Sequence, residues 1–151
     1  MERRIIPEII DGRQTLTCLP PDATVAEAVG LMVANRVGAV LLVEDERLVG
    51  IFTERDVVRR VVHPGRIPAE TPLHAVMTAE PDVLHATDSA AQALRLMTER
   101  GYRHLPVTDE EARPVGMVSV RDLFAAVQAE LQEDLQHRDA LIFDVGYGVS
   151  H

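Results

Sequence analysis

The residues best suited to chemistry occur twice, in two short segments of the same type. Each segment carries a hydroxyl, an arginine and a carboxylate: Thr53, Arg55 and Asp56 in the first, and Ser119, Arg121 and Asp122 in the second. Each hydroxyl lies between an apolar run and a predicted helix, where the free N–H groups and partial positive charge of a helix N-terminus favour an anion. A carboxylate instead suits vicinal hydroxyls such as those of a ribose. The combination predicts a site for a nucleotide.

The same spacing also has a purely structural interpretation. A Thr or Ser followed three residues later by Asp forms an acidic capping box, in which the hydroxyl and the carboxylate each bind a backbone N–H. Such a cap contributes about 1 kcal/mol of helix stability without any ligand. Thr53 with Asp56, and Ser119 with Asp122, can fill either role or both.

The elements that position these residues are also duplicated. The segment Thr24 to Met32 aligns with Ser89 to Met97, and both begin with a capping-box pattern and keep one apolar face at helical spacing. Two short apolar runs, joined by an acidic turn, follow each helix and predict paired strands buried on both faces. The strand pairs are Ala39 to Val43 with Leu48 to Phe52, and Leu105 to Val107 with Val115 to Val118. A second helix then follows, short in the first copy (Val57 to Val62) and extended toward His137 in the second.

Composition excludes several classes of function. The formal net charge is -9, so the field of the protein repels nucleic acid. Apolar runs reach only a handful of residues, whereas about 20 are needed to cross a bilayer. Residues 1–8 lack the apolar stretch of a secretory signal, which favours a cytoplasmic protein. The single Cys18 can form neither an internal disulfide nor a multi-cysteine zinc site, and we expect it to be buried as a small hydrophobe.

The duplicated pattern resembles the CBS domain, named after cystathionine beta-synthase. The resemblance rests on Thr24 to Met32, Gly38 to Val43 and Gly50 to Asp56 in the first copy, and on Val76 to Thr78, Arg103 to Val107 and Ser119 to Asp122 in the second. It implies an α+β fold of tandem CBS repeats, each β-α-β-β-α, packed as a pseudo-twofold module with two clefts between the repeats. The chain is similar to small bacterial proteins that consist of a CBS pair and little else.

The resemblance also implies a ligand and the residues that hold it. CBS clefts bind adenosine-containing ligands such as AMP, ADP, ATP or S-adenosylmethionine, and no other cofactor is required. In one cleft Asp122 would hold the ribose and Ser119, Arg103 and His104 the phosphate, with Thr17, Val37 and Gly38 on the adenine side. The other cleft would use Thr53, Asp56, Thr78 and Val83.

The two copies differ where phosphate would bind. Arg103 and His104 of the second copy align with the uncharged Gly38 and Ala39 of the first. Because arginine binds phosphate bidentately, we expect the cleft with Asp122 to bind nucleotide more tightly and the cleft with Asp56 to be weak or empty.

The sequence predicts four segments. These are a first repeat with an N-terminal segment (1–64), a linker rich in proline (65–75), a second repeat (76–137) and a C-terminal tail (138–151). The predicted function is a regulatory module that senses adenosine-containing nucleotides, of the AMP, ADP and ATP class, in the cleft between the two repeats. We expect it to form a homodimer and to signal to an unidentified partner protein, with no role for nucleic acid or membrane.

Two other classes of function stay open at this point. A structural dimerisation module without a physiological ligand would use Thr53 and Ser119 only as caps. An enzyme or metalloprotein has less support, because the histidines show neither i, i+4 pairing nor HExxH spacing and no nucleophile lies beside a paired base. We therefore predict no catalytic activity and no metal.

Overall fold

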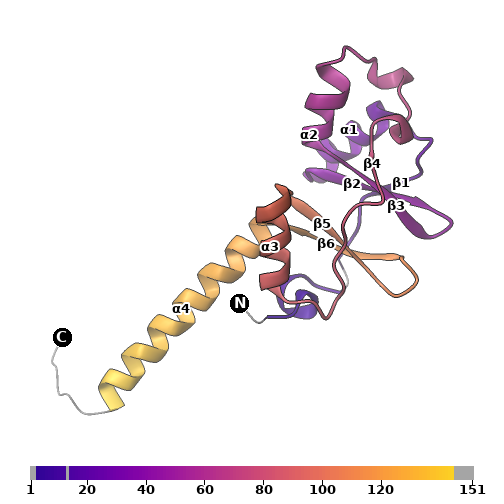
Figure 1. Ribbon diagram of the computed structural model, residues 1–151. Coiled ribbons are helices and arrows are strands. Elements are labelled where there is room, and N and C mark those ends of the chain that lie inside the picture. Colours follow the sequence, from indigo (N-terminus) through magenta and orange to yellow (C-terminus); the bar gives the residue numbers. More distant parts are fainter. Residues whose placement is uncertain (1–2, 13, 145–151) are drawn as a thin grey trace.

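The computed structural model shows two similar halves followed by a long helix (Figure 1). It describes residues 3–12 and 14–144. The first half contains β1 (Cys18–Leu19), α1 (Val25–Asn35), β2 (Ala39–Glu44), β3 (Arg47–Thr53), α2 (Glu54–Asp56) and the short helix η2 (Val57–Val62). The second contains α3 (Ala90–Arg100), β5 (His104–Thr108), β6 (Pro114–Ser119) and α4 (Val120–Asp144). Short segments η1 (Ile5–Ile9), η3 (Pro68–Glu70), η4 (Leu73–Ala75) and β4 (Thr78–Ala79) precede or join them.

Each half is built on an antiparallel hairpin. In the first half β2 pairs with β3, and β1 and β4 extend this pair to a four-stranded sheet in the order β1-β2-β3-β4. In the second half β5 pairs with β6. The turn between β2 and β3 places Asp45 and Glu46 at positive φ, as tight hairpin turns require, and the longer second turn places Ala112 there. The predicted hairpins and the turn-length difference between the copies are thus confirmed.

The helices begin where the capping patterns predict. The Ser89 hydroxyl accepts from the Gln92 N–H at 3.2 Å, and the Gln92 side chain accepts from the Ser89 N–H at 2.7 Å. At Thr24 the hydroxyl accepts from the Glu27 N–H at 3.2 Å. The structure does not assign Glu27 the return bond, so Thr24 caps α1 as a single acceptor rather than in a complete box.

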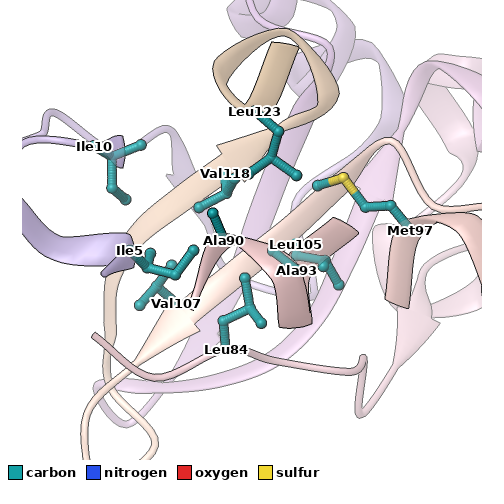
Figure 2. Packing of buried hydrophobic residues seen from close by; sticks show 10 residues of the cluster. All are labelled: Ile5, Ile10, Leu84, Ala90, Ala93, Met97, Leu105, Val107, Val118 and Leu123. Carbon is teal, nitrogen blue, oxygen red and sulfur yellow. The ribbon is translucent and has the colours of Figure 1, made fainter. Parts of the chain in front are cut away.

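The N-terminal segment packs on the second half rather than on the first. Ile5 and Ile10 are buried among apolar side chains of α3, β5, β6 and α4, as Figure 2 shows. The Ala90 N–H at the start of α3 donates to the Arg3 carbonyl at 2.8 Å, which fixes the segment along that helix end. The side chains around Ile5 and Ile10 in this cluster are Leu84, Ala90, Ala93, Met97, Leu105, Val107, Val118 and Leu123.

The segment between the halves packs in the equivalent way on the first half. Leu73 and Val76 are buried against Val25, Phe52 and other core residues of that half. The Val25 N–H at the start of α1 donates to the Thr71 carbonyl at 2.9 Å, matching the bond between Ala90 and Arg3. Each half therefore completes its core with the segment that precedes the other half's strands.

The position of Cys18 and the length of the last helix differ from the expectations drawn from the sequence. Cys18 is exposed on the edge strand β1 instead of buried, although nearby atoms withdraw its thiol from water enough to raise its pKa. Helix α4 continues past residue 137 to Asp144 and projects from the body (Figure 1), while residues 145–151 of the expected tail lie outside the described residues. No helix in the described part of the chain is long and apolar enough to cross a membrane.

Candidate functional site

Both hydroxyl and carboxylate pairs form the capping box that their spacing allows. The Thr53 N–H donates to the Asp56 carboxylate at 3.0 Å, and the Asp56 N–H donates to the Thr53 hydroxyl at 3.3 Å. The corresponding bonds between Ser119 and Asp122 measure 2.8 and 3.1 Å. In each box the capping bonds use only one carboxylate oxygen, Oδ2. The other oxygen of Asp56 lies 3.5 Å from Arg60 Nε, whereas the capping role of Asp122 leaves its other oxygen for a ligand.

The Ser119 and Asp122 pair opens into a cleft of about 1210 Å³, which we name the Asp122 cleft. Val37 and Gly38, in the connection between α1 and β2, face it from the first half. Arg103 and His104 face it from the start of β5, as the resemblance implied. The further lining residues are Gln14, Val29, Met32, Val33, Arg36, Glu54, Val57, Val58, Met117, Val120, Arg121 and Phe124.

The Thr53 and Asp56 pair opens into a second cleft of about 520 Å³, the Asp56 cleft. Thr78 lines it from β4, as expected. Tyr102 and Asp82 also line it and bind each other, because the Tyr102 hydroxyl donates to the Asp82 carboxylate at 2.7 Å. The further lining residues are Gly38, Ile51, Glu54, Arg55, Val58, Arg59, Arg60, Pro81, Arg100, Gly101, Arg103, His104, Leu105 and Pro106.

Two expected site residues line neither cleft. Thr17 is buried, and its hydroxyl accepts a hydrogen bond from the Asn35 side chain at 3.1 Å, which ties β1 to the end of α1. Val83 is half-buried next to Leu84, whose backbone pairs with β5. Both residues therefore support the strands behind the clefts in this structure.

The two clefts share one wall. Its five residues, which we name the shared wall, are Gly38, Glu54, Val58, Arg103 and His104. The ring of His104 lies against Gly38 so closely that a Cβ at position 38 would be only 3.0 Å from His104 Cε1. A larger residue at position 38 would therefore displace the histidine ring.

The basis for expecting a weak Asp56 cleft is wrong. Arg103 and His104 line both clefts, and four further arginines line the Asp56 cleft alone: Arg55, Arg59, Arg60 and Arg100. The Asp56 cleft thus has five arginines against three carboxylates, whereas the Asp122 cleft has three against two. Arg100 and Arg103 reach this cleft from the second half, and the other three arginines come from α2 and η2 of the first half itself. The comparison of Arg103 and His104 with Gly38 and Ala39 took neither contribution into account.

Several of these arginines are held by other groups. Arg55 donates to the Gly101 carbonyl at 3.0 Å, Arg60 donates to the Met77 carbonyl at 2.8 Å, and Arg100 lies 3.8 Å from Asp82. Within residues 3–12 and 14–144, the guanidinium groups of Arg59 and Arg103 make no hydrogen bond or ion pair. These two are the arginines of the Asp56 cleft that can turn to a ligand without breaking a bond.

His104 is shielded from water, and its charge depends on that shielding. Burial lowers the pKa of the imidazole below the ordinary value of 6.5, and the guanidinium of Arg103 lowers it further. Glu54 and Asp122 face the ring and act in the opposite direction. The ring is therefore neutral at pH 7, where it can exchange a hydrogen bond with a phosphate but adds no positive charge.

The residues missed by sequence reasoning include Tyr102, Glu54 and Gln14. Tyr102 aligns with Val37 in the repeat, so the alignment that assigned Val37 to one cleft could have assigned Tyr102 to the other. Glu54 lies inside the first duplicated segment. Gln14 gave no signal: its side-chain amide donates to the Met117 carbonyl at 3.2 Å and accepts from the Met117 N–H at 2.8 Å, as a neighbouring strand would.

No metal centre is visible in the described part of the chain. Among residues 3–12 and 14–144, no three side chains of His, Cys, Asp or Glu come close enough together to hold a metal ion. The polar groups of both clefts are instead those that bind sugar hydroxyls and phosphate: carboxylates, hydroxyls and arginines.

Comparison with known proteins supports the same interpretation. The family model for the CBS domain matches residues 8–63 and 73–129. The CBS domain-containing protein CBSX3, mitochondrial, of Arabidopsis thaliana is 37% identical over 126 residues, which are 80% of this chain and 61% of that protein. The chain thus spans about three fifths of that relative's length.

Solved structures resemble the fold over most of its length. A protein with CBS domains from Burkholderia ambifaria MC40-6 is 36% identical with a TM-score of 0.72, covering 78% of this chain and 85% of that one. The CBS domain protein PAE2072 from Pyrobaculum aerophilum, complexed with AMP, is 27% identical with a TM-score of 0.69, covering 76% and 86%.

Proposed function

The chain belongs to the CBS domain family, as a tandem pair of repeats, and we propose that it is a cytoplasmic regulatory module whose clefts bind adenosine-containing nucleotides. CBS pairs are regulatory modules, and the relative complexed with AMP supports an adenine nucleotide as the ligand class. In this proposal the module is not an enzyme and passes its ligand state to a partner protein.

One observation carries the proposal: each cleft combines a carboxylate, a hydroxyl at a strand end and uncommitted arginine. In the Asp122 cleft these are Asp122, Ser119 and Arg103. The free carboxylate oxygen accepts from the ribose hydroxyls, while the arginine binds phosphate. Positive lining charge in a protein of net charge -9 concentrates the anion at the clefts rather than elsewhere on the surface.

A regulatory role requires that nucleotide binds two arrangements of the protein unequally. The clefts lie between the halves, because the Asp122 cleft takes Val37 from the first half and Ser119 from the second. A nucleotide that contacts both halves therefore favours one relative placement of them, and α4, which begins at Val120 directly after Ser119, carries the change outward.

The test is thermal unfolding with AMP, ADP, ATP and S-adenosylmethionine, each measured separately. A ligand at about 100 times its dissociation constant stabilises the folded state by about 2.7 kcal/mol, so the melting temperature should rise. The double variant Asp56→Asn with Asp122→Asn should lose most of that rise. If none of the four ligands changes the melting temperature, the proposal fails.

The alternative is a structural dimerisation module without a physiological ligand. It is favoured by one observation: both capping boxes are complete without a ligand, so the duplicated residues already have a structural role. An unchanged melting temperature with all four ligands would support this alternative.

The proposal includes a homodimer, in which a second copy covers α4. Leu131 and Leu135 are each 58% exposed on the part of α4 that projects from the body (Figure 1). A helix in water depends mainly on packing of its apolar face, so an extended helix with two exposed leucines is expected to pack against the same helix of a second copy. Sedimentation equilibrium should show a dimer that Leu131→Glu with Leu135→Glu dissociates. A monomeric wild-type protein would contradict this part of the proposal.

A further inference from the structure

The shared wall makes some side chains common to both clefts. Arg103 and His104 reach the Asp122 cleft and the Asp56 cleft alike, together with Glu54. A nucleotide in either cleft would therefore meet the same charged groups. A nucleotide bound in one cleft would therefore alter the charged surroundings of the other without any change of fold.

The shared wall takes its basic side chains, Arg103 and His104, from the second half only. The Glu54 N–H donates to the Gly38 carbonyl at 3.0 Å, and the Val120 N–H donates to the Arg103 carbonyl at 2.9 Å, so Gly38 and Arg103 occupy equivalent backbone positions. The first half has no side chain at this position, and the ring of His104 packs against the space. One guanidinium therefore serves two clefts.

Arg103 is available to either cleft. Its guanidinium makes no hydrogen bond or ion pair in the part of the chain that the structure describes, so no internal bond commits it to one side. Glu54 places a carboxylate in the same wall, with Cδ 3.4 Å from the position of a Cβ on Gly38. With His104 uncharged at pH 7, Arg103 is the positive group that offsets Glu54 there.

We propose that the two clefts compete for Arg103, so that a phosphate-bearing nucleotide in one cleft weakens the binding of a second nucleotide in the other. This inference rests on the proposed function, because it requires that both clefts accept nucleotide. A guanidinium bound bidentately to one phosphate has fewer donors left for another, and the second phosphate also meets the first anion across the wall. The coupling is reciprocal, because each nucleotide weakens the other by the same factor.

The first experiment is calorimetric titration of the full chain with AMP and, separately, with adenosine. AMP should bind in two events, the second about 10-fold or more weaker than the first, within the usual range of coupling between sites. Adenosine carries no phosphate, so its two events should differ by less than about threefold. Competition so strong that the second AMP does not bind at all would give a stoichiometry of one AMP but two adenosines per chain, which also supports the inference. Equal AMP events would overturn the coupling while leaving the proposed function intact.

A second experiment separates competition from two clefts that are simply unequal. Asp56→Asn and Asp122→Asn each weaken one cleft while the amide oxygen can still accept the capping bond. If the clefts compete, each variant should bind one AMP in its unaltered cleft about as tightly as the wild type binds its first AMP, because Arg103 is then free for that cleft. If the clefts instead differ in intrinsic affinity, the variant altered in the tighter cleft should bind AMP only as weakly as the wild type binds its second AMP. That result would overturn the inference.

The third experiment removes the shared group. Arg103→Ala should weaken the first AMP event about 10-fold and reduce the gap between the two events to less than about threefold. Arg95→Ala is the matched control, because Arg95 lies exposed on α3 outside both clefts. A gap that persists in Arg103→Ala would contradict the inference. Binding of neither AMP nor adenosine by the wild type would overturn the inference together with the proposed function.

Discussion

Single residues of this site combine a structural and a binding role. Asp122 uses Oδ2 to accept the Ser119 N–H at 2.8 Å, and the Ser119 hydroxyl accepts the Asp122 N–H in return. The bonds hold the carboxylate in one orientation at the mouth of the cleft. A side chain that is already fixed loses little entropy when a ribose binds, so the cap favours the site rather than competing with it.

His104 should make the stability of the protein depend on pH. Its pKa is lowered mainly by burial, with Arg103 adding to the effect and Glu54 and Asp122 opposing it. Between the lowered pKa and 6.5 the unfolded chain binds more protons than the folded one, so the free energy of unfolding rises with pH. The contribution of His104 is therefore complete above about pH 6.5 and is lost as the pH falls through the folded-state pKa.

Urea unfolding between about pH 5.5 and 7.5 tests this prediction. His104→Gln removes the titrating group and should flatten the rise in the free energy of unfolding over that range. His63→Gln, which changes an exposed histidine after η2, is the control and should keep the wild-type slope. The prediction is wrong if both variants follow the same pH profile as the wild type.

Among the individual site residues, those inside the duplicated segments could be predicted from the sequence. Thr53, Asp56, Ser119 and Asp122 line the clefts because strand ends and helix starts are set by local spacing. Charge placement could not be predicted in the same way. Arg103 serves both clefts only because the halves face each other, and that contact joins residues far apart in the chain.

Two glycines show how elements constrain their residues differently. Gly50 lies in β3, where a Cβ would be 2.5 Å from Met77 Sδ and 3.1 Å from the Thr78 carbonyl oxygen. Gly30 lies exposed on α1, where a Cβ would meet nothing within 4 Å. The first glycine permits β4 to approach β3, whereas the second only weakens a helix.

Alanine at these two positions should change stability in opposite directions. Gly50→Ala should lower the free energy of unfolding by about 1–3 kcal/mol, because the Met77 side chain must leave its place and the Thr78 carbonyl of β4 must also give way slightly. Gly30→Ala should raise it by about 0.5–1 kcal/mol through helix propensity. Chemical denaturation of both variants provides the measurement, and each serves as the control for the other. Equal effects of the same sign would contradict this account of the β3 and β4 contact.

Most elements could be predicted because their signals are local. The acidic turns, the capping residues and the apolar faces each lie within a few residues of the element they define. The packing of η1 could not be predicted in this way. Ile5 is buried by α3 and β5 residues more than 70 positions later, and no local pattern states which half it covers.

Each half of the molecule buries a segment that directly precedes the other half in the chain. Residues 3–10 complete the core of the second half, and the segment with Leu73 and Val76 completes the core of the first. Arg3 adds a link to α4, because its guanidinium donates to both oxygens of Glu133 at 2.9 Å. The core of the first half lies within residues 19–77, whereas the core of the second half also requires Ile5 and Ile10, which precede the first half in the chain. The first half therefore lies between two parts of the second in the sequence, and we expect the two halves to unfold together.

Loss of one exchanged side chain should therefore weaken the entire molecule. Ile5 is fully buried, and Ile5→Ala should lower the free energy of unfolding by about 2–5 kcal/mol, through lost burial and the cavity left behind. Leu73→Ala makes the equivalent change in the other half and should cost a similar amount. Val33→Ala, on the exposed face of α1, should change it by less than about 0.5 kcal/mol.

The decisive observation is the number of transitions. Calorimetry of Ile5→Ala should show one transition at a lower temperature, because the first half lies in the chain between Ile5 and the rest of the second-half core, and Met117 of the second half packs on Leu41 and its neighbours in the first. Two separated transitions, with the first half melting at the wild-type temperature, would show that each half is stable on its own. The relative placement of the halves would then not be fixed by the exchanged segments, and nucleotide binding between them would have to supply it.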